Sequence, residues 1–326
     1  MIGAFRANNP FNTFMLLIYG LLLKLVWFIS PQVPVVQKAD GLLYNKILAT
    51  LKPLFDGYPV IYSLITYIFL YTQAISFNRL LNNRRLMQKP NYLPAMSYLL
   101  ITSFFAEWNV LSAPLVINTL LIWVWAKMSS LYNNPHAKST LYNIGIVIGI
   151  TTFFYFPSLA FALMMIFAVL ITRPPKVAEW IIAVLGIATP WYLLFAWLFL
   201  INQLYSFQVS GIHIDYPLFA KTNTQLTGIA LIMLTTIVGG FFVQSNIRKQ
   251  IVQVRKGWGL MALYLFVALF IPFINSSHNF QYWILATVPL SAFIACFFFY
   301  PTKRWIPLFV HWIMIAFVIY MTLIKK

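Results

Sequence analysis

The chain has 326 residues, of which 61% are hydrophobic and only 8% are charged, and its net charge is +17. A soluble domain usually carries about 25% charged residues, so this composition excludes a water-soluble protein and indicates an integral membrane protein. The positive charge does not indicate a nucleic-acid partner, because the basic residues are spread over short loops without a block or a binding motif.

Apolar runs of about 20 residues recur along the chain, whereas the alternation typical of a membrane β-barrel is absent. We therefore predict an all-α, polytopic helix bundle with about eleven transmembrane helices, which forms a single transmembrane domain over residues 1–326 without a soluble domain. Pro190 should bend the seventh span, and Gly145 and Gly149 suit the fifth to close helix contact. The expected spans are about 12–30, 58–77, 92–107, 113–128, 142–156, 158–172, 180–205, 225–244, 258–274, 280–300 and 305–324.

The first span follows a short tail with one arginine, Arg6, and lacks an A-x-A cleavage pattern, so we expect it to be retained as a helix. Lys24 lies inside this span, where a charged side chain is costly. Its amine either extends to the membrane surface, which is the interpretation we favour, or faces a polar interior.

Residues 31–58 form the first external loop, and they contain two of the five acids, Asp40 and Asp56. Between 41 and 52, apolar side chains recur at helical spacing on one face and polar side chains occupy the other. This segment is too short to span, so we expect an interfacial amphipathic helix that ends at about Lys52, where Pro53 and Asp56-Gly57 then stop and turn the chain. Asp40 is either a functional carboxylate or the N-cap of this helix. Asp56 is expected to be a turn residue.

The lysines and arginines indicate the orientation of the bundle. With the N-terminus in the cytoplasm, the inner segments hold fifteen of the 22 basic residues and the outer segments six, in agreement with the positive-inside rule. Lys325 and Lys326 disagree, and they would move inside if the last span did not cross. Four of the five acids fall on the outer side, on loops that can converge over the bundle: Asp40, Asp56, Glu107 and Asp215.

Glu107 ends the third expected span, where the helix dipole disfavours an acid. A cation, a metal ion or a partner lysine would compensate for it, and solvation is the alternative. Lys46 and Lys52 lie on the polar face of the amphipathic helix, where they either hold a lipid phosphate or extend to anionic headgroups. His213 and His278 have no metal-ligand spacing, so the sequence leaves a metal site unknown.

An early aspartate and an interfacial helix after the first span, followed by a basic inner loop, resemble the GT-C superfamily. Its members are polytopic glycosyltransferases that use polyprenyl-phosphate-linked sugars at the outer face. The stretches Phe5-Arg-Ala-Asn-Asn-Pro-Phe-Asn12 and Phe154-Tyr-Phe-Pro-Ser-Leu159 also resemble an uncharacterised membrane family of Bacteroidota. The GT-C resemblance covers mainly the first six or seven spans, and it implies a protein of the bacterial inner membrane.

This resemblance implies that Asp40 is the catalytic carboxylate of the first external loop and that Glu107 is the assisting acid of the second, with a divalent cation as a candidate cofactor. The implied partner is a membrane lipid, a polyprenyl-phosphate sugar donor. Its phosphate would be held by basic side chains of the outer loops: Lys46, Lys52, Lys221 and His278. The chain departs from the family in having Ala39-Asp40-Gly41 where many members have an Asp-Glu or His-Asp-Glu cluster, and in lacking a large external domain.

A second hypothesis is a non-catalytic protein, either a subunit of an inner-membrane envelope complex or a carrier for a lipid or small solute. Lys24 is the single charged residue deep inside a predicted span. Coupled transporters usually show more intramembrane charge. The sparse polarity within the spans therefore favours this second hypothesis.

Overall fold

The computed structural model describes residues 2–55, 57–132, 134–174, 176–204, 213–214, 216–217, 222–274 and 280–324. Within these ranges the chain forms helices and no β-strand, which confirms the all-α prediction. The α-helices are α1 (Ile2–Arg6), α2 (Phe11–Ile29), α3 (Leu42–Phe55), α4 (Val60–Asn83), α5 (Leu93–Ile101), α6 (Ala113–Met128), α7 (Ala137–Thr151), α8 (Phe161–Thr172), α9 (Val177–Leu200), α10 (Asn223–Ile247), α11 (Val252–Phe270), α12 (Thr287–Phe299) and α13 (Trp305–Ile324). Short 3-10 helices are η1 (Ala106–Asn109), η2 (Phe156–Ala160), η4 (Ile271–Phe273) and η5 (Phe280–Ala286).

Seven of the described segments are long and apolar enough to cross a membrane, which is fewer than the eleven predicted. They are α2, α4, α9, α10, α11 with η4, η5 with α12, and α13. The other predicted spans are shorter helices: α5, α6, α7 and α8. A helix needs about 20 residues to cross the hydrocarbon core, and α5 and α7 stop early because the chain turns after Ile101 and Thr151.

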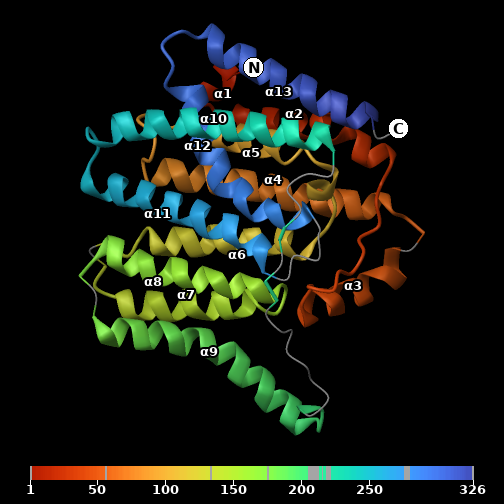
Figure 1. The fold of residues 1–326 in the computed structure, drawn as a ribbon, viewed down its shortest axis with the longest axis vertical. Helices are drawn as coiled ribbons and strands as arrows, with labels where there is room; N and C mark the ends of the chain where they lie inside the picture. The colour runs from red at the N-terminus through yellow and green to blue at the C-terminus, as the bar shows by residue number, and fades with distance from the viewer. Residues whose placement is uncertain are drawn as a thin grey trace.

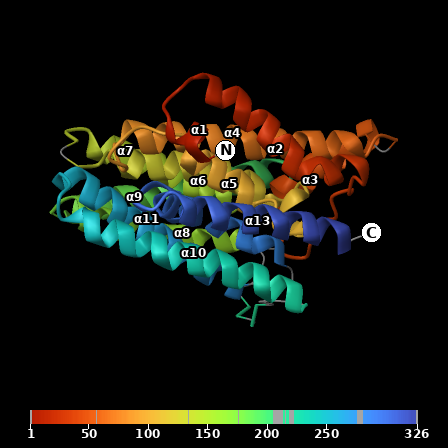
Figure 2. The ribbon, with the colours of Figure 1, turned by 90° about the horizontal axis from the view of Figure 1, so that it is seen from above.

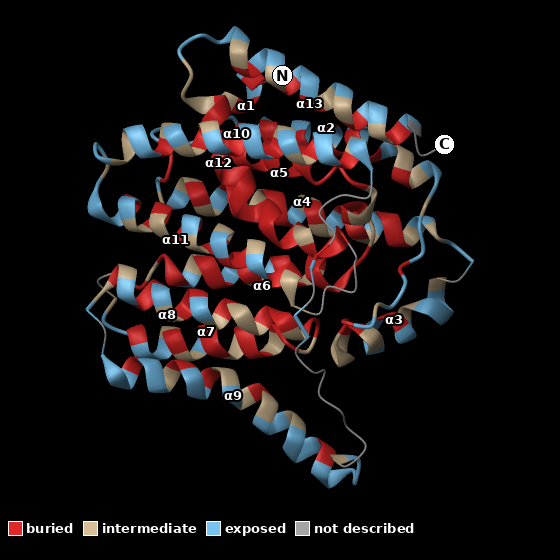
Figure 3. Cartoon of the chain, viewed as in Figure 1, coloured by how far each residue is buried: buried red, intermediate tan, exposed pale blue. Residues whose placement is uncertain are grey.

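The long helices lie side by side across the molecule, and α3 lies apart from them near one end (Figure 1). Seen from above, α2 and α4 form one face and α10 forms the other, with α5 and α6 between them (Figure 2). The centre of the bundle is α5 and α12: all nine residues of α5 are buried, and so is 89% of the span that contains α12. Figure 3 shows this buried centre in red.

Two predicted details of helix packing are confirmed. A Cβ added at Gly145 would come within 2.6 Å of the Ala183 carbonyl oxygen, and one at Gly149 within 2.6 Å of the Ile187 carbonyl oxygen, so glycine allows α7 to touch the backbone of α9. Pro190 lies inside α9, which bends along its length in Figure 1. The helix predicted to end at about Lys52 is three residues longer, because α3 continues through Pro53 to Phe55. Proline removes one helical hydrogen bond, and here little helix remains after it.

The favoured interpretation of Lys24 was wrong. Its side chain is 2% exposed and does not reach the membrane surface. The Nζ atom donates hydrogen bonds to Asn109 Oδ1 at 2.6 Å and to Thr102 Oγ1 at 3.3 Å. The segment after α5 therefore folds back beside α2 and provides neutral oxygen atoms for a buried amine.

Segments predicted to share a side of the membrane do meet at one end of the bundle. We call one end the basic end, with Arg6 and the residues 84–92, 129–132, 134–136, 173–174, 176, 248–251 and 300–304, and hydrogen bonds there join Tyr92 N to Phe5 O and Trp258 Nε1 to Leu86 O. We call the other the Asp40 end, with residues 30–41, 102–112, 152–160, 271–274 and 280–286. Of the four acids on the outer loops predicted to converge, the structure describes Asp40 and Glu107, and both lie at the Asp40 end; the convergence of the loops of Asp56 and Asp215 stays a prediction.

Candidate functional site

The Asp40 end is built on a backbone junction between the first external loop and the link from α7 to η2. The N–H of Gly41 donates to the carbonyl of Phe154 at 2.6 Å, and the N–H of Leu43 donates to the carbonyl of Phe153 at 2.9 Å. Asp40 and Tyr155 form an antiparallel bridge. A Cβ at Gly41 would overlap the Phe153 carbonyl, so this close approach requires glycine.

The carboxylate of Asp40 is enclosed at this junction, with only 6% of the residue exposed. Its Oδ2 atom accepts a hydrogen bond from Gln37 N at 2.8 Å, whereas Oδ1 is buried and has no partner among the described residues. The alternative that Asp40 caps the helix is therefore wrong. Leu43 N, in the first turn of α3, bonds to the carbonyl of Phe153 instead, and Gly41 N, directly before the helix, bonds to that of Phe154.

Burial raises the pKa of Asp40 from its ordinary value of 3.8 to about 6, against the smaller lowering effect of the hydrogen bond from Gln37. Among the described residues no lysine or arginine forms an ion pair with this carboxylate. A carboxylate with a pKa near neutrality and a buried free oxygen atom is suited to accept a proton from a bound group.

A second buried oxygen without a hydrogen-bond partner lies at the start of α3. Asn45 Nδ2 donates to the carbonyl oxygen of Asp40 at 3.5 Å, and Asn45 Oδ1 has no partner within the described part of the chain. Buried acceptors are normally satisfied, so two unsatisfied oxygens at one helix start indicate a place for a ligand that donates hydrogen bonds.

Two buried tyrosines surround this junction, and the sequence analysis did not identify them. Tyr44 of α3 donates to Leu111 O at 2.8 Å, and Tyr155 donates to Ile274 O at 3.1 Å. Burial raises the pKa of both phenols, and the charge of the neighbouring Asp40 raises it further. Tyr44 was hidden in the apolar arc of the amphipathic helix, and the one sequence signal for Tyr155 was its position in the stretch 154–159.

Tyr155 also stacks on Tyr282, with ring centroids 4.6 Å apart and an interplanar angle of 12°. This contact links the turn after α7 to η5, which precedes the buried helix α12. Together with the hydrogen bonds of the two tyrosine hydroxyls, it fixes Asp40 among four separate segments of the chain.

Glu107 belongs to a different part of the Asp40 end. It does not end a long helix as predicted, because α5 stops at Ile101 and Glu107 lies in the first turn of η1. Its Oε1 atom accepts a hydrogen bond from Gln225 Nε2 of α10 at 3.3 Å. Asp40 and Glu107 have different partners, and no hydrogen bond in the described ranges joins them.

The basic residues predicted to bind phosphate do not approach either carboxylate where they are described. Lys46 and Lys52 are exposed on α3. Lys221 and His278 lie outside the described residues, as do Asp56 and Asp215. Among the residues that the structure places, no three His, Cys, Asp or Glu side chains are grouped to hold a metal ion.

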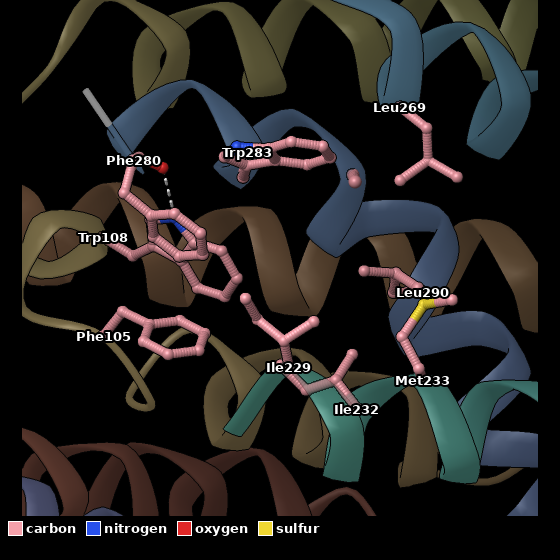
Figure 4. Close-up of a pocket in the computed structure, with 10 residues that line it drawn as sticks. Phe105, Trp108, Ile229, Ile232, Met233, Leu269, Phe280, Trp283 and Leu290 are labelled. Carbon is pink, nitrogen blue, oxygen red and sulfur yellow. Dashed lines mark hydrogen bonds between the residues drawn. The ribbon is translucent and has the colours of Figure 1, made fainter. Parts of the chain in front are cut away.

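A small apolar cavity of about 80 Å³ lies beside η1, between α10, α11, η5 and α12 (Figure 4). Trp108 donates from Nε1 to the carbonyl of Phe280 at 3.3 Å, and their rings stack with centroids 5.6 Å apart. Because the lining offers no polar surface, the cavity suits a hydrocarbon group and not a sugar or phosphate. Its walls come from residues far apart in the chain: Phe105, Trp108, Ile229, Ile232, Met233, Leu269, Phe280, Trp283, Ala286 and Leu290.

The chain was compared with family models, curated proteins and solved structures, and one family model matches it. No curated protein and no solved structure matches it. One family model, described as a family of unknown function (DUF6427), matches residues 17–326 and so includes both Asp40 and the apolar cavity. Because this match spans nearly the whole sequence, the chain belongs to the DUF6427 family.

Proposed function

We propose that the protein is a GT-C-like membrane glycosyltransferase that uses a polyprenyl-phosphate-linked sugar, with Asp40 as its general base. The observation that supports this most is the buried Asp40 Oδ1, which has no hydrogen-bond partner in the described part of the chain and belongs to a carboxyl with a pKa of about 6. Placing an unpaired carboxylate oxygen in a buried junction costs stability, and such sites are typical of functional groups.

In the proposed reaction, the acceptor hydroxyl donates its proton to Asp40 Oδ1 while its oxygen forms a bond to the anomeric carbon of the sugar. The bond between that carbon and the phosphate oxygen breaks, and its electron pair leaves with the polyprenyl phosphate. A carboxylate that takes a proton in this way contributes about 10²- to 10⁴-fold to a rate. The amide oxygen Asn45 Oδ1 is a second acceptor for the hydroxyl groups of a sugar.

The lipid part of the donor would use other surfaces of the same end. The apolar cavity beside η1 accepts hydrocarbon, and the exposed Lys46 and Lys52 of α3 offset the charge of a phosphate at the membrane surface. Lys221 and His278 keep the same proposed role. The described carboxylates do not fit a divalent cation, because Asp40 and Glu107 are not grouped, and no step is assigned to one.

We propose further that the basic end faces the cytoplasm of a bacterial inner membrane and that the shorter helices α5 to α8 complete eleven crossings. These helices lie alongside the long ones in Figure 1. The alternation of segments between the two ends agrees with the distribution of lysine and arginine, ten of which fall within the ranges that define the basic end.

The direct test is Asp40→Asn in membrane vesicles that contain the polyprenyl-phosphate sugar donor and acceptor. Removal of the base should reduce the initial rate of glycan formation at least about 100-fold while the protein expresses and folds normally. Wild-type activity should rise as the pH increases through about 6, because the base must be ionised. Undiminished glycan formation by the folded variant would exclude this role.

The second candidate is a non-catalytic subunit or a lipid carrier. The specific observation in its favour is the closure of the site: Asp40 is only 6% exposed, and the cavity near Glu107 has no polar lining. Purification in mild detergent separates the two candidates. A stoichiometric protein partner without any bound lipid-linked sugar would support the subunit, and a co-purified lipid-linked sugar would support the transferase.

A further inference from the structure

A groove of about 760 Å³ lies at the basic end, between α1, the loop after α4 and the turn from α12 to α13. Three cations line it, Arg6, Lys89 and Arg304, and no acidic residue does. Its volume falls within the range of about 300–1,000 Å³ that is common for small-molecule sites. The space and the charge together indicate a site for an anion.

The cations of this groove are not neutralised by the protein. Arg6 Nη2 donates to the carbonyl oxygens of Phe298 and Phe299, which leaves Nη1 and Nε without partners among the described residues. Burial lowers the pKa of Arg6, and the nearby charge of Arg304 lowers it further. The side chains of Lys89 and Arg304 make no hydrogen bond or ion pair in the described ranges.

The described carboxylates lie elsewhere. Asp40 and Glu107 belong to the opposite end of the bundle, and Glu179 pairs with Arg173 at 3.3 Å. Two guanidinium groups that repel each other beside an open groove are stabilised by a bound anion, because a phosphate accepts several charge-assisted hydrogen bonds at once.

The groove continues onto the apolar surface of a membrane-spanning helix. Pro307 and Leu308 of α13 line it. The adjoining Trp305 and Phe309 are 64% and 60% exposed, and only 28% of this span is buried inside the protein. Figure 3 shows exposed residues along α13. A ligand with a phosphate head and hydrocarbon chains matches this arrangement, because its chains would cover the exposed side of α13.

We propose that the groove of Arg6, Lys89 and Arg304 binds the phosphate-bearing headgroup of an anionic phospholipid whose acyl chains lie along α13. Arg6 is held in position by two backbone carbonyls and presents its remaining N–H groups to a phosphate oxygen. Arg304 and Lys89 approach from the other two walls. This site is independent of Asp40 and of glycosyl transfer.

The test is native mass spectrometry of the full chain in detergent, titrated with phosphatidylglycerol or phosphatidylcholine. Phosphatidylglycerol should bind in a one-to-one complex, and phosphatidylcholine should bind at least about tenfold more weakly. The variant Arg304→Gln/Lys89→Gln should bind phosphatidylglycerol at least about tenfold more weakly than the wild type does. Each cation near a membrane surface contributes about 1 kcal/mol to the binding of an anionic lipid.

The matched control is Arg248→Gln/Lys249→Gln, which removes two exposed cations from the basic end outside the groove. It should change the affinity less than about twofold. Equal weakening by the two double variants, or equal binding of the two lipids by the wild type, would overturn the site. Inorganic phosphate at the lipid concentration should not displace the lipid, because it cannot contact α13; displacement would overturn the lipid assignment in favour of free phosphate. The wild-type comparisons decide the proposal even if a variant does not fold.

Discussion

The two ends of the bundle differ in the sign and the exposure of their charged side chains. At the Asp40 end, a carboxylate is enclosed by tyrosines and backbone carbonyls, and its charge disappears on protonation at a pH of about 6. At the basic end, three basic side chains line an open groove of about 760 Å³. The difference separates two kinds of chemistry: the closed end is suited to move a proton, and the open end is suited to hold an anion.

The two ends are also held together differently. Segments at the Asp40 end meet through backbone-to-backbone hydrogen bonds, such as Gly41 N to Phe154 O, and through tyrosine hydroxyls. At the basic end, one backbone bond joins Tyr92 N to Phe5 O, and long side chains also donate to carbonyls, such as Arg173 Nη1 to Asn134 O at 3.2 Å. Backbone junctions fix positions more tightly, because they involve fewer rotatable bonds.

The strongest test of this contrast is the pH dependence of stability. A rise of the Asp40 pKa from 3.8 to about 6 on folding means that the folded state binds protons more tightly than the unfolded state. The stability is therefore full below pH 3.8 and falls by about 3 kcal/mol as the pH rises through 6.

Asp40→Asn should remove this loss, so the variant should be more stable than the wild type at pH 8 by up to about 3 kcal/mol and equally stable at pH 3.5. The measurement is unfolding by denaturant in detergent at the two pH values. A variant that is less stable at pH 8 would show that the carboxylate contributes to the fold, and the contrast between the two ends would fail.

Substitution of the glycine at the junction gives the next largest effect. Gly41→Ala places a Cβ against the Phe153 carbonyl and should destabilise the protein by about 1–3 kcal/mol. The control is Gly57→Ala, where no atom lies within 4 Å of the added Cβ. Its free energy of unfolding, measured by thermal unfolding, should change by less than about 0.5 kcal/mol. Equal effects of the two substitutions would argue against the close backbone junction.

The smallest expected effect is the coupling between Asn109 and the buried amine of Lys24, near the Asp40 end. Asn109→Leu removes one hydrogen-bond partner of Lys24 and should lower the free energy of unfolding by about 2 kcal/mol. Combining it with Lys24→Met should recover about 1 kcal/mol of that loss, because no unpaired amine remains. A double-mutant cycle by chemical unfolding measures this coupling, and an additive result would place the Lys24 amine away from Asn109.

The sequence by itself determined the class of the protein and much of its helical plan. The predicted span 113–128 coincides with α6, and the helix predicted at 41–52 overlaps α3 at 42–52. The spacing of apolar residues predicts where these helices lie, because that spacing is a local property of each segment. The number of long spans was overestimated, since composition does not show where α5 and α7 end for the chain to turn.

Only the tertiary structure decided which distant segments meet. It placed Asp40 beside Tyr155, Trp108 beside Phe280, and Arg6 beside Phe299, pairs that are separated by more than 100 residues in the chain. It also showed that Lys24 is buried, whereas the sequence favoured an amine that extends to the membrane surface. Burial, unpaired oxygens and cavities arise from contacts between segments, and no local pattern encodes those contacts.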